Sequence, residues 1–182
     1  QNNHISGEQH WNNALWVRQY LAPRPRPMNS VKIYGARESR FGPSDQHGIE
    51  RFWRNVLAGL AAVRFHRPPA GLGLGDKAQA SLRALRKLES VVKLWDLEPA
   101  NQLLGRRGNN EAYLAAAPGK AYVIYFTRAG SVSLEVPSGL YRLRWLDLGS
   151  GEWAGDQRLR SGGSLNLETP APGNWLAVVV KE

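Results

Sequence analysis

The spacing of apolar residues over the first hundred positions predicts three helices. In "GEQHWNNALWVRQYLA", residues 7–22, apolar side chains recur at helical intervals, and the "PRPRP" that follows ends the helix. A second helix is predicted to start near Gly48 or Ile49. The third is predicted to begin at Asp76, its expected N-cap. The apolar stripe of this third helix is the set Leu82, Leu85, Leu88 and Val92.

Two short buried strands are predicted between these helices. "MNSVKIYG" (28–35) is closed by a glycine, and "AAVRFHR" (61–67) is stopped by two prolines. Strand, helix, strand and helix in this order indicate βαβ units with a parallel sheet. Two strands do not make a stable sheet alone. We therefore expect neighbouring strands from an upstream segment, from another chain or from an exchanged segment.

After about residue 107 the pattern changes to short strands separated by turn sequences. The candidates are "EAYLAAA", "KAYVIYFT", "SVSLEV", "LYRLRWLDL" and "NWLAVVV". In the fourth, Tyr141, Leu143 and Trp145 alternate with Arg142 and Arg144, as in an antiparallel strand with one buried face. Residues 108–182 are predicted to form a small antiparallel β-sandwich. The fold class is therefore α/β plus all-β, divided at 1–107 and 108–182.

The composition is that of a folded chain. It has 182 residues, of which 42% are hydrophobic, and no cysteine, so disulfides and thiolate metal sites are excluded. No apolar run approaches the ~20 residues that span a bilayer, so no membrane association is expected. The chain starts "QNNHIS", with neither Met nor a basic leader. We expect a processed or truncated piece of a larger protein, and its localisation stays open.

The net charge of +9 lies entirely in the first part. Residues 1–107 hold 17 Lys/Arg and 8 Asp/Glu, whereas residues 108–182 hold 7 of each. Nucleic-acid binding requires cations on one face, interleaved with aromatic rings. Many cations here stand among prolines or on helix backs, as Arg83, Arg86 and Lys87 do. The charge therefore favours a solvated surface or a docking face, and nucleic acid is not the expected partner.

Polar side chains follow the predicted parallel strands. If the strands belong to a barrel, their carboxyl ends face the active site. The candidate substrate-binding residues there are Asn3 and His4 (next to Asn2), Lys32 and Tyr34, and Arg64, His66 and Arg67. Such groups hydrogen-bond sugar hydroxyls, and arginine binds carboxylates in a bidentate way. Each residue could equally be an ordinary strand cap or a solvated side chain.

A complete catalytic site is not visible. Glycoside hydrolysis usually requires two carboxylates about 5–9 Å apart. The candidates Glu8, Glu38, Asp45 and Glu50 do not stand at the end of a predicted strand. The four histidines lack metal-ligand spacing, no serine stands in a Gly-x-Ser-x-Gly turn, and "GLGLGDK" lacks the phosphate-loop spacing. No cofactor or metal is predicted, and the catalytic residues are not identified.

Several stretches together resemble one family. They are "RPMNSVKIYG", "ERFWRNVLAG", "VRFHRPPAGLGL", "LWDLEPANQLL", "NEAYLAAAPGKAYVIYF" and "LYRLRWLDLGSGEW". Over nearly the whole chain they resemble the C-terminal portion of glycoside-hydrolase-like proteins, in which a (β/α)8 barrel precedes a β-sandwich of the collagen-binding type. The resemblance implies a polysaccharide-active protein whose first barrel units, with the acid/base residue, lie outside this sequence. The second carboxylate is expected near "SVKIYG", which carries Lys32 and Tyr34 and no Glu.

The predicted function is therefore that of a C-terminal fragment of a carbohydrate-active enzyme. It would supply part of the substrate cleft and an accessory sandwich, and whether it is itself an enzyme stays open. The expected partners are a polysaccharide or oligosaccharide, and the missing barrel segment or a second copy of the chain. The alternative is a non-catalytic module that binds glycan or matrix protein, with Trp153 and Trp175 as a stacking platform if they are exposed. A third hypothesis is anion or nucleic-acid binding driven by the charge.

Overall fold

The computed structural model describes residue 5, residues 7–37 and residues 39–182, which form two compact units. The first unit comprises residues 1–79 and the second residues 80–182. The predicted domain boundary at 107/108 stays a prediction, because the units are defined by where contacts within the chain are dense and not by which parts fold independently.

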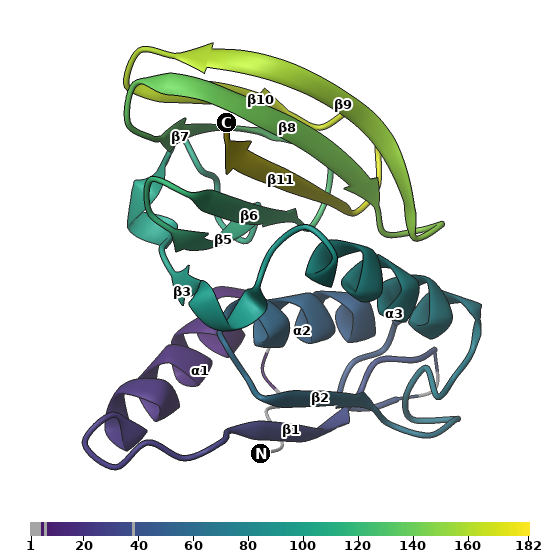
Figure 1. The fold of residues 1–182 in the computed structure, drawn as a ribbon. Coiled ribbons are helices and arrows are strands. Elements are labelled where there is room, and N and C mark those ends of the chain that lie inside the picture. The colour runs from purple at the N-terminus through teal and green to yellow at the C-terminus, as the bar shows by residue number, and fades with distance from the viewer. Residues whose placement is uncertain (1–4, 6, 38) are drawn as a thin grey trace. The chain divides into compact units, whose positions relative to one another are not determined.

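The first unit is built of βα segments (Figure 1). Its elements are α1 (Gly7–Leu21), β1 (Asn29–Ile33), α2 (Asp45–Leu57) and β2 (Ala62–Phe65), and α3 (Asp76–Glu89) begins in it. β1 and β2 pair in parallel, with Asn29 opposite Ala62 and Ile33 opposite Phe65. The predicted parallel pairing is confirmed.

Helix α2 packs on one face of this strand pair. The Phe52 ring stacks on the Phe65 ring at a centroid distance of 4.7 Å and an interplanar angle of 10°. Both rings are buried, as are Ile33 of β1 and Trp53 of α2. Because side chains alternate along a strand, Arg64 and His66 stand on the face opposite Phe65. The pairing register of β1 shifts between Ser30 and Ile33, and Lys32 is assigned to the same face because its charge acts on His66. The helix therefore fixes which face of the strand pair carries the polar candidates.

Helix α2 begins earlier than predicted. The sequence places its start near Gly48 or Ile49, whereas the helix begins at Asp45 after the N-cap Ser44. The Ser44 hydroxyl accepts a hydrogen bond from the His47 backbone N–H at 3.4 Å and contacts its Nδ1 at 2.8 Å. This side-chain cap replaces the missing intrahelical acceptors, so the polar turn before the apolar residues is also helical.

A glycine pair joins the end of β1 to α2. Gly35 has φ +148°, and a Cβ added there would lie 2.2 Å from the Gly48 backbone nitrogen. Only glycine fits at position 35, because the positive φ and the close backbone contact each disfavour a side chain. The strand end and the first turns of the helix are thus in direct backbone contact.

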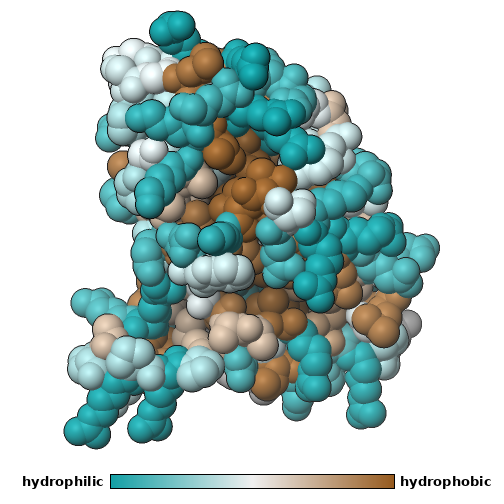
Figure 2. Space-filling view, in the orientation of Figure 1, coloured by the Kyte–Doolittle hydropathy of each residue, from teal (hydrophilic) through white to brown (hydrophobic). Residues whose placement is uncertain are grey.

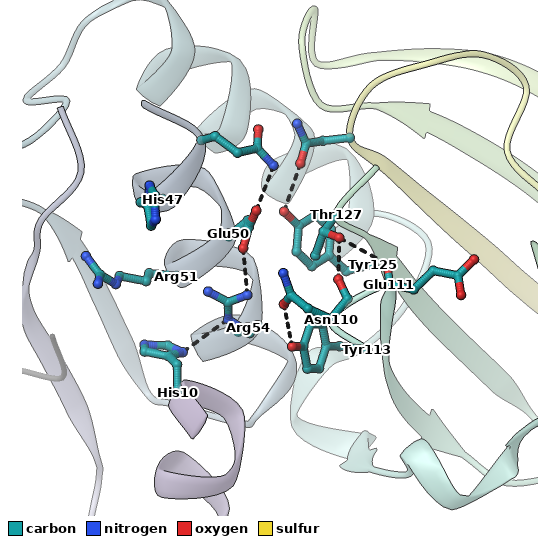
Figure 3. Close-up of polar contacts among 12 residues, drawn as sticks. His10, His47, Glu50, Arg51, Arg54, Asn110, Glu111, Tyr113, Tyr125 and Thr127 are labelled. Carbon is teal, nitrogen blue, oxygen red and sulfur yellow. Dashed lines mark hydrogen bonds and ion pairs between the residues drawn. The ribbon is translucent and has the colours of Figure 1, made fainter. Parts of the chain in front are cut away.

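Helix α1 buries a polar cluster as well as the predicted apolar residues. Trp11 and Ala14 are buried as expected, and so is His10, at 1% exposure. Arg54 of α2 donates from Nε to His10 Nδ1 at 3.3 Å and from Nη1 to Glu50 at 2.8 Å (Figure 3). Burial, and then the charges of Arg54 and Arg51, lower the pKa of His10 to about 2. His10 is therefore a neutral hydrogen-bond acceptor inside the unit.

The second unit holds two sheets after the end of α3. The strands are β3 (Glu98–Pro99), β4 (Leu104–Gly105), β5 (Ala112–Ala117), β6 (Ala121–Phe126), β7 (Ser131–Glu135), β8 (Gly139–Asp147), β9 (Glu152–Ser161), β10 (Ser164–Glu168) and β11 (Trp175–Lys181). Their pairing is antiparallel throughout, in the orders β3-β5-β6-β11-β8-β9 and β10-β7-β4. Two single 3₁₀ turns, Leu94–Asp96 and Asn101–Leu103, precede the main strands.

Both sheets contribute to one hydrophobic core. Val132 and Leu134 of β7 and Leu165 of β10 lie in the same buried cluster as the inward side chains of the six-stranded sheet. That cluster includes Tyr141, Leu143 and Trp145, while Arg142 is exposed, so the predicted alternation of this strand is confirmed. Hydrophobic side chains gather over β6 and β11, framed by hydrophilic ones (Figure 2).

The sequence analysis missed β9 and β10. β9 is an edge strand whose residues, apart from Ser161, are exposed or half-buried, so it lacks the apolar alternation that marks a strand. β10 alternates, but only Leu165 and Leu167 are apolar. The prediction of a mixed α/β structure with antiparallel sheets is confirmed. The strands β9 and β10 are defined by their pairing with β8 and β7 rather than by an apolar pattern.

The buried stripe of α3 differs from the predicted one. Ala80, Ser81, Ala84 and Leu88 are buried, whereas Leu82 is 37% exposed. The small residues allow close approach: a Cβ added at Gly151, in the β8–β9 turn, would lie 2.7 Å from the Ala80 carbonyl oxygen. Lys87 pairs with Glu152 on the same side. Asp76 lies in the first turn of the helix rather than before it.

No helix among the described residues has both the length and the apolar character that crossing a membrane requires.

The buried His10 predicts a specific dependence of stability on pH. The folded-state pKa near 2 lies below the unfolded value of 6.5, so the unfolded chain binds the proton first as the pH falls. The free energy of unfolding should therefore fall between pH 6.5 and 4 more steeply than in His10→Gln, by up to about 1.4 kcal/mol per pH unit. Urea unfolding followed by tryptophan fluorescence measures both slopes. Asn12→Gln, an exposed change in the same helix, should keep the wild-type slope, and parallel curves for His10→Gln and wild type would contradict the prediction.

The glycine contact predicts a large effect of one methyl group. Gly35→Ala should lower the free energy of unfolding by about 3 kcal/mol or more, because backbone atoms at 2.2 Å cannot be relieved by a rotamer change. Gly119→Ala is the matched control. Its φ is also positive, at +76°, but nothing lies within 4 Å of the added Cβ. Chemical denaturation should show a loss of only about 1 kcal/mol there, and equal losses for the two variants would show that the contact is unimportant.

Candidate functional site

The carboxyl ends of β1 and β2 bring two predicted residues into contact. The Tyr34 and His66 rings lie 4.8 Å apart between centroids, at an interplanar angle of 45°. The His66 backbone N–H donates to the Ile33 carbonyl at 3.0 Å, which continues the parallel pairing by one step beyond the strands. Lys32, Tyr34 and His66 are all half-buried. Open α/β sheets place ligands at this end of their strands.

Cations surround His66. Its pKa is lowered from 6.5, first by burial and then by the charges of Lys32, Arg67 and Arg64. His66 is therefore neutral at pH 7 and has one donor and one acceptor nitrogen. A neutral imidazole, a tyrosine hydroxyl and an ammonium group together provide the mixed donors and acceptors that sugar hydroxyls require.

The two arginines of the predicted set are exposed at the edge of this group. Arg64 donates from Nε to the Val31 carbonyl at 3.1 Å, which holds its side chain along the neighbouring strand. The Arg67 carbonyl accepts from the Gly71 N–H at 3.1 Å, inside the turn that contains a cis peptide bond between Pro68 and Pro69. The structure thus brings Tyr34 and His66 into contact and places Lys32, Arg64 and Arg67 near enough for their charges to act on His66.

The remaining predicted site residues, Asn3 and His4, lie outside the described residues, as do Asn2 and Glu38. Their placement in the site stays a prediction.

The sequence analysis did not identify Arg51, which organises the loop after β1. Arg51 is buried, and its Nη1 donates to the Tyr34 carbonyl at 2.9 Å and to the Phe41 carbonyl at 2.5 Å. Its Nε donates to the Ile5 carbonyl at 3.1 Å. Figure 3 shows it on the same helix as His47 and Glu50. Arginine within an apolar helix face was the available signal, but the pattern does not reveal which carbonyls it would bind.

Phe41 is a second residue that sequence reasoning missed. Its ring meets the Tyr34 ring edge-on at 5.2 Å, and the Arg40 guanidinium lies 4.5 Å from its centroid. Tyr34 is therefore held between two aromatic neighbours, His66 and Phe41, and its orientation is restricted before any ligand binds.

The candidate carboxylates have other roles. Asp45, in the first turn of α2, pairs with Lys77 at 2.7 Å. Glu50 pairs with Arg54 and accepts a hydrogen bond from Gln46. Both carboxylates are thus engaged in ion pairs within the described part of this unit.

In the described part of the chain, no three His, Cys, Asp or Glu side chains stand close enough together to hold a metal ion.

Of the two tryptophans proposed as a stacking platform in the second unit, Trp175 is buried and Trp153 is half-buried. Trp175 is 7% exposed and meets Trp145 edge-on at 6.4 Å, and its Nε1 donates to the Ala171 carbonyl at 2.8 Å. The Trp153 ring is half-buried beneath the Arg144 guanidinium, 3.8 Å from its centroid. Trp175 is therefore not available as a stacking surface, and one face of the half-buried Trp153 is occupied by Arg144, so the pair does not form the exposed platform that the alternative of a binding module requires.

The electrostatics of the site predict how His66 responds to its neighbours. Lys32→Met should raise the pKa of His66 towards 6.5, because a positive charge that disfavours the imidazolium is removed. Titration of the His66 ring protons by NMR measures the shift. Arg160→Gln, an exposed change in the second unit, is the control and should leave the curve unchanged. An unaltered pKa in Lys32→Met would show that the two side chains do not interact.

Comparison with known proteins shows which solved structures have a similar fold. No protein-family model matches the chain, and neither does any curated protein sequence. Among solved structures, it is similar to a glycoside hydrolase family 5 protein from Bacteroides vulgatus ATCC 8482, with a TM-score of 0.68 and 13% identity over 97% of this chain and 46% of that one. A second structure, described as a glycoside hydrolase, has a TM-score of 0.68 and 12% identity over 100% and 48%. The chain spans about half the length of these structures and shares their fold.

Proposed function

We propose that this chain is the C-terminal portion of a carbohydrate-active, glycoside-hydrolase-like protein. Residues 1–107 would contribute βα units to a (β/α)8-type barrel, and residues 108–182 would be its accessory β-sandwich. The observation that carries the proposal is the cluster of Tyr34, His66 and Lys32 at the carboxyl ends of two parallel strands. Ligands bind at this end in both barrels and open parallel sheets.

The edges of the strand pair support the barrel assignment. Among the described residues of the first unit, β1 and β2 pair only with each other. A two-stranded parallel sheet has unpaired backbone groups on both outer edges and is not stable by itself. Further strands from an upstream segment or from a second copy of the chain would satisfy these groups. The similarity to about half of each glycoside hydrolase structure supports the same arrangement.

The side chains support a role in positioning substrate. A neutral His66, the Tyr34 hydroxyl and the Lys32 ammonium group can hydrogen-bond sugar hydroxyls, and the ring of Tyr34 can contact a pyranose face. Asp45 and Glu50 are engaged in ion pairs elsewhere. Proton transfer in the intact protein would therefore rely on carboxylates other than these two.

Binding to neutral oligosaccharides tests the proposal. The chain should bind a β-linked glucose, xylose or mannose oligomer, and Tyr34→Ala and His66→Ala should each weaken binding about fivefold, the equivalent of one hydrogen bond or ring contact. Isothermal titration calorimetry gives the affinities, and NMR shift changes at His66 locate the ligand. Trp95→Ala, which removes a 79% exposed ring in the second unit, is the control. Binding that is unaffected by both site variants, or no binding to any of the three oligomers, would overturn the proposal.

A further inference from the structure

An exposed aromatic pair stands on α1, away from the candidate site. Trp16 is 62% exposed and Tyr20 is 73% exposed, one helical turn apart. Their rings are stacked, with centroids 5.7 Å apart and an interplanar angle of 17°. Trp11 on the same helix is buried, as a core residue would be. Each ring of the pair covers one face of the other, and the high exposure of both leaves the outer aromatic faces accessible on a helix.

A basic loop adjoins this surface. Residues 22–28, between α1 and β1, place Arg24 and Arg26 between three prolines, and both arginines are exposed. A cavity of about 320 Å³ lies here, lined by Tyr20, Leu21, Pro23, Arg24 and Arg26. Strongly hydrophilic side chains project from this loop at the lower left of Figure 2. Because each proline fixes its backbone φ, less conformational entropy is lost when the arginines bind a ligand.

The charge around the pair is of one sign. Between residues 9 and 31 the sequence has no Asp or Glu and three cations, Arg18, Arg24 and Arg26. Of the four described carboxylates of the first unit, Asp45 and Glu50 pair with Lys77 and Arg54, and Glu8 and Asp76 lie in the first turns of α1 and α3. Arg24 and Arg26 form no ion pair with any described residue. The surface is thus complementary to an anion that also has a flat apolar face.

We propose that Trp16, Tyr20, Arg24 and Arg26 form a binding site for an anionic polysaccharide whose sugars carry carboxylates. A sugar ring would stack on the aromatic pair, and the guanidinium groups would bind uronate carboxylates, for which their fork geometry is suited. A single-stranded nucleic acid also combines rings with negative charge, but its binding proteins use a groove that follows about 4–16 nucleotides. A 320 Å³ cavity with two arginines fits one or two charged sugars instead.

This site is independent of the candidate site at the strand ends. Residues 22–28 lead directly into Asn29, so the surface lies at the amino end of β1, whereas Tyr34 and His66 lie beyond the carboxyl ends. The inference goes beyond the proposed function and does not rest on it. A polysaccharide held here would be anchored apart from the place where neutral oligosaccharide is expected to bind.

The test compares two ligands and two pairs of substitutions in the full chain. The ligands are a galacturonate hexamer and its methyl-esterified form, which keeps the rings and lacks the charges. Titration calorimetry should show binding of the free acid that is at least about tenfold tighter than that of the ester. Arg24→Gln/Arg26→Gln should weaken only the free acid, by a similar factor. Trp16→Ala/Tyr20→Ala should weaken both ligands.

The outcomes that would contradict this proposal differ from those that would contradict the proposed function. Trp95→Ala and Arg160→Gln remove an exposed ring and an exposed cation in the second unit, and neither should alter binding. Circular dichroism checks that each variant is folded, as expected for exposed positions. The proposal would be overturned if the chain bound the acid and the ester with equal affinity, or if it bound single-stranded DNA of equal charge more tightly. It would also be overturned if neither sugar ligand bound and the chain instead self-associated in a way that Trp16→Ala abolishes. The third outcome would assign the surface to a contact between copies of the chain.

Discussion

The local structure at the carboxyl end of β1 depends on one buried guanidinium group. Arg51 joins carbonyls from three separate segments, at Ile5, Tyr34 and Phe41, and it is 2% exposed. Burial lowers its pKa to about 10, so it is still positively charged at neutral pH. Burying a charge costs free energy unless its hydrogen-bond donors are paired, as those of Arg51 are here. Without Arg51, the three carbonyl oxygens would lose a charged hydrogen-bond donor. The backbone that presents Tyr34 is therefore fixed by a residue that does not itself face the site.

Local patterns predicted the parts of the fold that local chemistry determines. The helix of residues 7–22 and the parallel pair around 28–35 and 61–67 follow from apolar periodicity, and Tyr141, Leu143 and Trp145 face the core as their alternation indicates. The start of α2 was missed because a serine cap extended it, and β9 was missed because an edge strand needs few apolar residues. Both errors arise where a hydrogen bond, rather than burial, decides the structure.

The candidate site was predictable in its residue types and not in its organisation. The sequence identified Lys32 and Arg64 only as polar residues near the ends of predicted strands, whereas the face that each occupies depends on the packing of Phe65 against Phe52 of α2. The contacts of Tyr34 with Phe41 and His66 involve residues 7 and 32 positions away, and no local pattern encodes them. The burial of His10 beside two arginines was equally invisible, since it requires α1 and α2 to meet.

The absence of side chains at Gly35 and Gly48 has a consequence for how this site can vary. Where two backbones touch without an intervening methyl group, the distance between strand end and helix start has no room for adjustment. Side chains such as Lys32 and Tyr34 stand on that fixed frame and can be exchanged without moving it. New binding specificities in this fold would therefore be reached more readily by replacing residues at the rim than by lengthening the segment between β1 and α2.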